Sequence, residues 1–149
     1  MINKLRVKAQ SESGFTLVEL LVVMLILGLL AAIAIPAFFN QRTKAQDAEA
    51  KSTVKTAQTA METFATDNNG SYATADRAKL KAIEPTLSSA SSGTNSLTTL
   101  TVASNAYTLT VTSASGNTFS IVRDSTGSLT YPCTPSGGGG GCPGSQGWG

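Results

Sequence analysis

The sequence has no histidine and only two cysteines among its 149 residues. Without histidine, the chain cannot by itself build a Ser-His-Asp or Cys-His catalytic set or a His-ligated metal site. Two cysteines are too few for a four-thiolate zinc or iron–sulfur site. Charged residues make up only 13% of the chain, and the net charge of +2 is too small to indicate a nucleic-acid-binding protein. We therefore expect no enzyme, cofactor or metal, and one ordinary domain.

The apolar residues are concentrated in one run near the N-terminus, from residue 15 to 39, where the only charged residue is Glu19. The 20 uncharged residues Leu20–Phe39 would form about 30 Å of helix, enough to cross a bilayer core. Residues 1–14 carry three basic side chains, which the positive-inside rule places on the cytoplasmic side. The sequence thus predicts a single-pass segment with the rest of the chain outside the cytoplasm.

Two other interpretations of this run stay open. A buried helix of a soluble protein is one, although so continuous a run this close to the N-terminus seldom folds into a core. A secretory signal peptide is the other, because Ala32-Ile33-Ala34 has the small-residue cleavage form. Against it, the Glu19 charge inside the apolar run costs roughly 2.5–3.5 kcal/mol on insertion scales, and the helical pattern continues past that cleavage point.

An ionisable residue within a membrane segment indicates a function, and its partner has to be sought. Cleavage between Gly14 and Phe15 would create an α-amino group four residues before Glu19, on the same helical face. The segment Ser13-Gly14-Phe15-Thr16-Leu17-Val18-Glu19-Leu20 resembles the prepilin cleavage motif of type IV pilins and the related type II secretion pseudopilins. The resemblance covers about residues 1–70.

The resemblance implies that a prepilin peptidase/methyltransferase cuts after Gly14 and N-methylates Phe15. It also implies that Glu19 directs assembly into a helical homopolymer, in which it meets the Phe15 ammonium of another copy. A buried charge without a partner costs several kcal/mol, so this pair would fix the register between subunits. Pairing of Glu19 with its own Phe15 would use the same residues. The implied partners are other copies, the peptidase, the pilus assembly machinery and, before assembly, membrane lipid; no nucleic acid is implied.

Beyond the apolar run, residues 40–66 predict an amphipathic continuation of the helix, which the turn-forming segment Asp67-Asn68-Asn69-Gly70 ends. Its apolar stripe recurs at three- and four-residue steps and comprises Ala50, Val54, Ala57, Met61, Phe64 and Ala65. In the apolar half we expect a helix break at Gly28 and Pro36, because proline removes a backbone donor and glycine weakens a helix by roughly 1 kcal/mol. The resemblance implies local unwinding there in filaments; a simple proline kink is the alternative.

Residues 67–149 predict a globular head of the α+β class. A short helix around Ala75–Ala82 would end before Pro85. Four strand-like runs follow, joined by short turns that favour an antiparallel meander: Leu97–Ala103, Ala106–Ser113, Thr118–Arg123 and Ser128–Tyr131. One sheet face can pack on the stripe of the long helix, which leaves a threonine face in water. This arrangement, a long N-terminal helix on a small antiparallel sheet, is the pilin fold that the resemblance implies.

Cys133 and Cys142 enclose eight residues, and outside the cytoplasm such a pair is most simply a disulfide. Type IV pilins commonly have a disulfide-bounded C-terminal loop, so the resemblance agrees. A redox pair is the alternative, but the C-x-x-C spacing is absent. The segment Asp67–Gly70 resembles part of a calcium loop, which fails because Ala78 stands where the EF-hand glutamate is needed.

The sequence is therefore interpreted as a type IV pilin precursor: leader 1–14, membrane and filament-core helix 15–39, amphipathic helix 40–66 and head 67–149. It would be anchored in the cytoplasmic membrane before assembly and extracellular on the cell surface afterwards. A type II secretion pseudopilin is the first alternative, although the acidic ligands of a C-terminal calcium site are scarce, since only Asp124 follows Glu84. A membrane-anchored exported domain that does not polymerise is the second.

Overall fold

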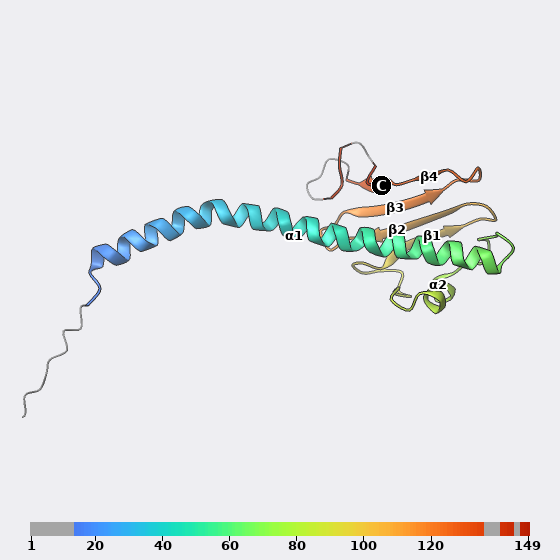
Figure 1. Cartoon of the computed structure of the whole chain (residues 1–149), viewed down its shortest axis with the longest axis horizontal. Helices are drawn as coiled ribbons and strands as arrows, with labels where there is room; N and C mark the ends of the chain where they lie inside the picture. Colours follow the sequence, from blue (N-terminus) through green and yellow to red (C-terminus); the bar gives the residue numbers. More distant parts are fainter. Residues whose placement is uncertain (1–13, 136–140, 145–146) are drawn as a thin grey trace, which may run out of the picture. The chain divides into compact units, whose positions relative to one another are not determined.

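The computed structural model describes residues 14–135, 141–144 and 147–149. The leader, apart from Gly14, and the glycines at 137–140 lie outside these ranges. The elements are α1 (Leu17–Asp67), α2 (Arg77–Ile83), β1 (Leu97–Val102), β2 (Tyr107–Thr112), β3 (Thr118–Arg123), β4 (Leu129–Thr130) and β5 (Cys133–Thr134). A long N-terminal helix and a small antiparallel sheet confirm the predicted α+β class (Figure 1).

The chain divides into two compact units, one up to Ala37 and one from Phe38 to Gly149. In the first unit α1 is helical throughout, and Gly28 and Pro36 both lie within it. The expected break at these two residues is therefore not present as a loss of helix in the single chain. Unwinding there stays a proposal for an assembled state.

In the second unit, the apolar stripe of α1 packs on the sheet to form the core, and Figure 1 shows this part of α1 lying over the strands. The stripe from Ala50 to Ala65 is buried, as its three- and four-residue spacing predicts. From the sheet it meets the alternate residues of β2 and β3 that point the same way. The fully buried strand side chains are Leu109, Val111, Phe119 and Ile121.

The sheet is a meander in the order β1-β2-β3-β4. Strand β5, which follows β4 in the chain, also pairs with β3. The alternation predicted for β2 is present, since Tyr107, Leu109 and Val111 are buried. The threonines between them were expected to lie in water but are half-buried, because residues of β1 and β3 lie beside them at strand spacing. The sequence analysis did not predict β5, which has two residues and follows a proline.

Local signals fix the end of α1 and the start of α2. Gly70, at a φ of 81°, donates its N–H to the carbonyl of Ala65 at 2.8 Å, and the Asn68 side chain donates to the Phe64 carbonyl at 2.8 Å. The cluster that resembles a calcium loop therefore serves as the C-terminal cap of α1. Asp76 caps the start of α2 by accepting the Lys79 N–H at 2.8 Å.

Candidate assembly site

The start of α1 holds Glu19 in a closed set of hydrogen bonds with Thr16. The Glu19 N–H donates to Thr16 Oγ1 at 3.2 Å, while Glu19 Oε2 accepts from the Thr16 N–H at 3.2 Å and from its hydroxyl at 2.9 Å. This reciprocal pattern is a capping box, in which side chains satisfy N–H groups that a helix start leaves without partners. The sequence analysis did not recognise it, although Thr16-Leu17-Val18-Glu19 has the required T-x-x-E spacing.

The capping box changes what the assembly hypothesis requires of Glu19. In the uncut chain the Phe15 nitrogen belongs to a peptide bond, so neither of the two ammonium pairings can form. One carboxylate oxygen, Oε2, is already engaged by Thr16. Within the described part of the chain, Oε1 accepts no hydrogen bond and faces solvent with the exposed side chain. Glu19 can therefore keep its helix cap through Oε2 and receive a cation through Oε1.

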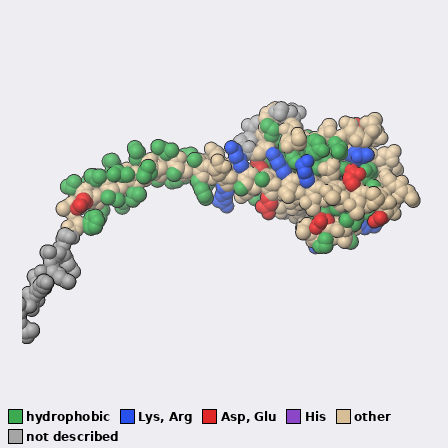
Figure 2. Space-filling view, in the orientation of Figure 1, with side chains coloured by type: hydrophobic (Ala, Val, Ile, Leu, Met, Phe, Trp, Pro, Cys, Tyr) green, Lys and Arg blue, Asp and Glu red, His purple; other side chains and the backbone are tan. Residues whose placement is uncertain are grey.

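The surface around Glu19 is apolar on every side. From Phe15 to Phe39, 17 large hydrophobic side chains are exposed, with exposed fractions from 46% at Val22 to 81% at Leu17 (Figure 2). Soluble monomers rarely expose so much contiguous apolar surface. Among the described residues, α1 is the one helix long and apolar enough to cross a membrane. This surface needs a partner outside the chain, either lipid or other helices.

Two glycines near this surface have no structural requirement within the chain. A Cβ atom added at Gly14 or at Gly28 would meet no atom of the described structure within 4 Å. A requirement for a small residue at either position would therefore come from a partner outside the chain. At Gly28 a second helix could then pack closely, as small residues allow in membranes.

At the other end of the chain, Cys133 and Cys142 form the predicted disulfide, with their Cα atoms 5.7 Å apart. Both residues are buried, and β5 brings Cys133 beside Phe119 of β3. Their burial does not favour the redox alternative, which needs an accessible thiol. The bond joins the sheet to the segment that contains Gly141.

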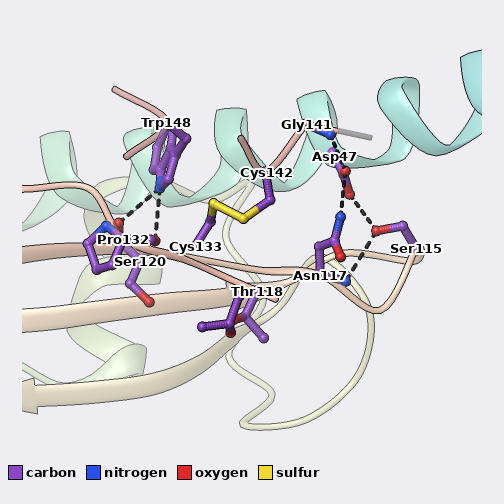
Figure 3. Close-up of a disulfide and its surroundings, with 11 residues drawn as sticks. Asp47, Ser115, Asn117, Thr118, Ser120, Pro132, Cys133, Gly141, Cys142 and Trp148 are labelled. Atoms are coloured by element: carbon purple, nitrogen blue, oxygen red, sulfur yellow. Dashed lines mark hydrogen bonds between the residues drawn. A yellow bond between two sulfur atoms is a disulfide. The ribbon is translucent and has the colours of Figure 1, made fainter. Parts of the chain in front are cut away.

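Asp47 fastens this segment to α1 (Figure 3). Its side chain is fully buried and accepts hydrogen bonds from the Ser115 hydroxyl, from Asn117 Nδ2 at 2.9 Å and from the Gly141 N–H at 2.7 Å. A Cβ atom at Gly141 would lie 2.9 Å from Asp47 Cβ, so only glycine permits this approach. One carboxylate thus connects the helix, the β2–β3 turn and the disulfide segment.

The hydrogen bonds also set the charge of Asp47. Burial alone raises the pKa of a carboxyl group, and it is the largest single influence here. The donors from Ser115, Gly141, Ser113 and Asn117 together outweigh burial and hold the pKa of Asp47 below its ordinary value. Asp47 is therefore a buried carboxylate at neutral pH. Its role was not predicted from the sequence, because its partners lie about seventy and ninety residues away.

Trp148 closes the C-terminal segment on the sheet. Its indole N–H donates to the carbonyls of Ser120 at 3.2 Å and Pro132 at 3.1 Å (Figure 3). Its ring contacts Phe119 and Tyr131 edge to face, with centroids 5.8 and 5.5 Å apart. Trp148 is therefore held on the head by hydrogen bonds as well as by ring contacts.

Glu62 connects α1 to three side chains of the head. The hydroxyls of Tyr72 and Tyr107 each donate to it at 2.7 Å, and Arg123 lies 3.7 Å away. Burial and the neighbouring Glu62 charge raise the pKa of both tyrosines, so they remain donors. Sequence analysis placed Glu62 on a polar face of the helix and gave it no partner. In the described part of the chain no cluster of acidic or cysteine side chains could hold a metal ion.

The family-model comparison matches the apolar N-terminal region of the chain. A family model, the prokaryotic N-terminal methylation motif, matches residues 10–35. The type IV major pilin protein of Myxococcus xanthus is 47% identical over 51 residues, which are 34% of this chain and 23% of that protein. The type II secretion system core protein G of Aeromonas hydrophila is 38% identical over 58 residues, 39% of this chain and 41% of that protein. The type IV major fimbrial protein of Dichelobacter nodosus is 43% identical over 56 residues, 38% and 36% of the two chains.

The motif, the exposed apolar helix and the sheet that packs on its second half define a class of protein: a subunit anchored by an N-terminal helix. Together with these relatives, they support a place for the chain in the superfamily of type IV pilins and type II secretion pseudopilins. The chain spans less than half the length of the curated relatives it matches. No solved structure matches it significantly.

Proposed function

We propose that this chain is a prepilin, cleaved between Gly14 and Phe15, N-methylated at Phe15 and polymerised through α1 into an extracellular type IV pilus. The observation that carries the proposal is the division of α1. From Phe15 to Phe39 the chain exposes 17 large apolar side chains, whereas the apolar stripe in the second half of α1 is buried in the chain's own head. A subunit built in this way needs lipid before assembly and other copies afterwards, and its role is structural rather than catalytic.

The geometry at Glu19 supports a specific assembly step. The capping box occupies Oε2 and leaves Oε1 for the ammonium that cleavage would create at the N-terminus of another copy. In a water-free bundle of helices, a carboxylate without its cation costs several kcal/mol. Docking in the wrong register would leave both charges in this state. The ion pair would then favour one register between subunits over the adjacent registers.

The test is to shear cells that express the chain and to examine the released material by electron microscopy and mass spectrometry. We expect filaments that contain this chain, with a mature N-terminus at a methylated Phe15. A mature protein that begins at Ile35 would show instead that residues 1–34 are a signal peptide. A correctly processed chain that stays in the membrane under all conditions would favour the exported domain that does not polymerise.

A type II secretion pseudopilin is the second candidate, since pseudopilin core proteins are among the relatives that the chain matches. The two candidates share the cleavage site and the helix, so the N-terminus does not separate them. Deletion of the chain from its own organism does so. Loss of surface filaments with normal protein secretion supports the pilin, and retained exoprotein in the periplasm supports the pseudopilin.

A further inference from the structure

The head presents a basic stripe directly after the membrane segment. Lys44, Lys51 and Lys55 lie within about 40° of one another around α1, at about 100° per residue. Lys44 and Lys55 are exposed and Lys51 is half-buried, and basic side chains gather along this part of the helix in Figure 2. We call these three residues the lysine stripe. It begins five residues after Phe39, where the uncharged run ends.

Little negative charge accompanies the stripe on α1. Between residues 40 and 61 the acidic residues are Asp47 and Glu49. Asp47 is buried and its oxygens are taken by donors from the head. Glu49 is exposed but lies about 140° away from Lys44 around the helix. The stripe therefore presents positive charge to whatever faces it.

Aromatic rings border the stripe. Lys55 Nζ lies 5.0 Å from the centre of the Tyr131 ring, and Lys51 and Lys55 lie 5.7 and 5.6 Å from that of Trp148. Both rings are half-buried, so part of each reaches the surface beside the amines. Lysine together with tryptophan and tyrosine is the composition that proteins place at the headgroup level of a bilayer.

The charges also run against a topological rule. With Arg42, the stripe gives four basic residues within about 16 positions after the span, where the positive-inside rule disfavours them on an outer side. The leader has only three basic residues to oppose them. Such a cluster weakens the charge bias that would orient the chain. A binding role on the outer side would account for its presence there.

We propose that the lysine stripe and its aromatic border form a docking surface for anionic phospholipid headgroups, which holds the head of the unassembled subunit on the bilayer. The partner follows from charge complementarity and from continuity with the apolar segment. The stripe meets headgroups when the stretch from Lys44 to Lys55 lies along the bilayer surface. The proposal rests on membrane anchoring of the chain, and not on filament formation.

Trp148 is the only tryptophan in the chain and lies beside the stripe, so its fluorescence reports whether lipid covers this surface. The full chain is inserted into vesicles of phosphatidylcholine, with or without phosphatidylglycerol, that carry a nitroxide on the lipid headgroup. We expect stronger quenching of Trp148 in the vesicles with phosphatidylglycerol, and a loss of the difference in high salt. Equal quenching in the two lipids would overturn the proposal.

Lys44→Gln is the sharpest variant, because Lys44 contacts no aromatic ring in the described structure and its loss leaves the head intact. We expect it to lower the ratio of docked to undocked heads about fivefold. The matched control is Lys81→Gln, an exposed lysine of α2, which should change nothing. Equal effects of the two variants, or quenching that follows protein concentration instead of lipid charge, would assign the surface to a second copy and refute lipid docking. Filament yield enters neither measurement, so failure here leaves the pilin proposal untouched.

Discussion

The two halves of α1 use their apolar residues in opposite ways. From Leu17 to Ala37 the apolar residues surround the helix and are exposed in the single chain. From Ala50 to Ala65 they form one stripe that is buried on the chain's own sheet. A substitution in the first half should therefore act on membrane insertion and assembly. One in the second half should act on the stability of the head.

The largest effect should come from Glu19→Ala, in the first half. It removes both the carboxylate and the capping box, and we expect filament yield to fall at least tenfold, because a partner ammonium would be left buried alone. Insertion should be unimpaired, since a charge leaves the apolar run. Filament mass after shearing measures the first effect, and the amount of membrane-resident processed protein measures the second.

Glu19→Gln is the matched variant for this test, because glutamine can keep the capping box while it loses the charge. If the ion pair matters, the Gln variant should assemble as poorly as Ala. Normal assembly of the Gln variant would show that the helix cap is what assembly requires. Normal assembly of both variants would rule out the register mechanism.

In the second half, Asp47→Ala should have the largest effect on stability. It leaves the donors of Ser115, Asn117 and Gly141 without their acceptor, and we expect a loss of about 3 kcal/mol in the free energy of unfolding. Denaturant unfolding of the purified protein in detergent measures it. Insertion and cleavage should stay normal, and a variant of unchanged stability would show that these contacts contribute nothing.

Asp47 also predicts a pH dependence of the head. Its pKa is lowered in the folded state, so its contribution is present above the unfolded value of about 4 and is lost as the pH falls through the folded pKa. The native protein should therefore lose stability below about pH 4. Asp47→Asn should flatten this acid limb. A limb of unchanged slope in the Asn variant would assign the effect to other carboxylates.

Removal of the disulfide should have the next largest effect. Replacement of both Cys133 and Cys142 by serine should cost about 2–3 kcal/mol in the chain-entropy model, because the closed loop is short. The C-terminal segment should also become sensitive to protease. Trp148 bonds to Ser120 and Pro132 independently of the disulfide, so its fluorescence should change little. Labelling of free thiols in the native, unreduced protein would contradict the bond itself.

The sequence predicted those elements whose cause is local. The stripe of α1 follows from helical spacing, and the alternation of Tyr107, Leu109 and Val111 follows from strand spacing; the structure confirms both. The capping box at Glu19 was also predictable, because the T-x-x-E pattern is complete within the four consecutive residues from Thr16 to Glu19. The disulfide needed only the pair of cysteines and an exported location.

What the sequence could not predict depends on distant partners. Asp47 and Glu62 look like ordinary polar residues of an amphipathic helix, and only the fold brings Asn117 and Tyr107 to them. Strand β5 is too short to show alternation and exists because β3 offers an edge. Gly28 and Pro36 illustrate the opposite limit. The single chain shows continuous helix there, and unwinding stays a proposal for an assembled state in which other helices surround these residues.

The smallest effect should come from Glu62→Gln, which tests whether the second half of α1 also depends on charge. Glutamine keeps the size and one acceptor oxygen but loses the charge that strengthens the bonds from Tyr72 and Tyr107 and attracts Arg123. Hydrogen bonds to charged groups are roughly twice as strong as neutral ones, so we expect a loss of about 1 kcal/mol in the free energy of unfolding. The control is Glu49→Gln on the same helix, where the exposed carboxylate accepts no hydrogen bond in the described structure. It should cost less than about 0.5 kcal/mol. Equal losses in the two variants would mean that general charge on α1, and not the tyrosine contacts, sets the effect. A loss of filaments with unchanged stability in Glu62→Gln would place this residue with the assembly surface and remove the distinction between the two halves of the helix.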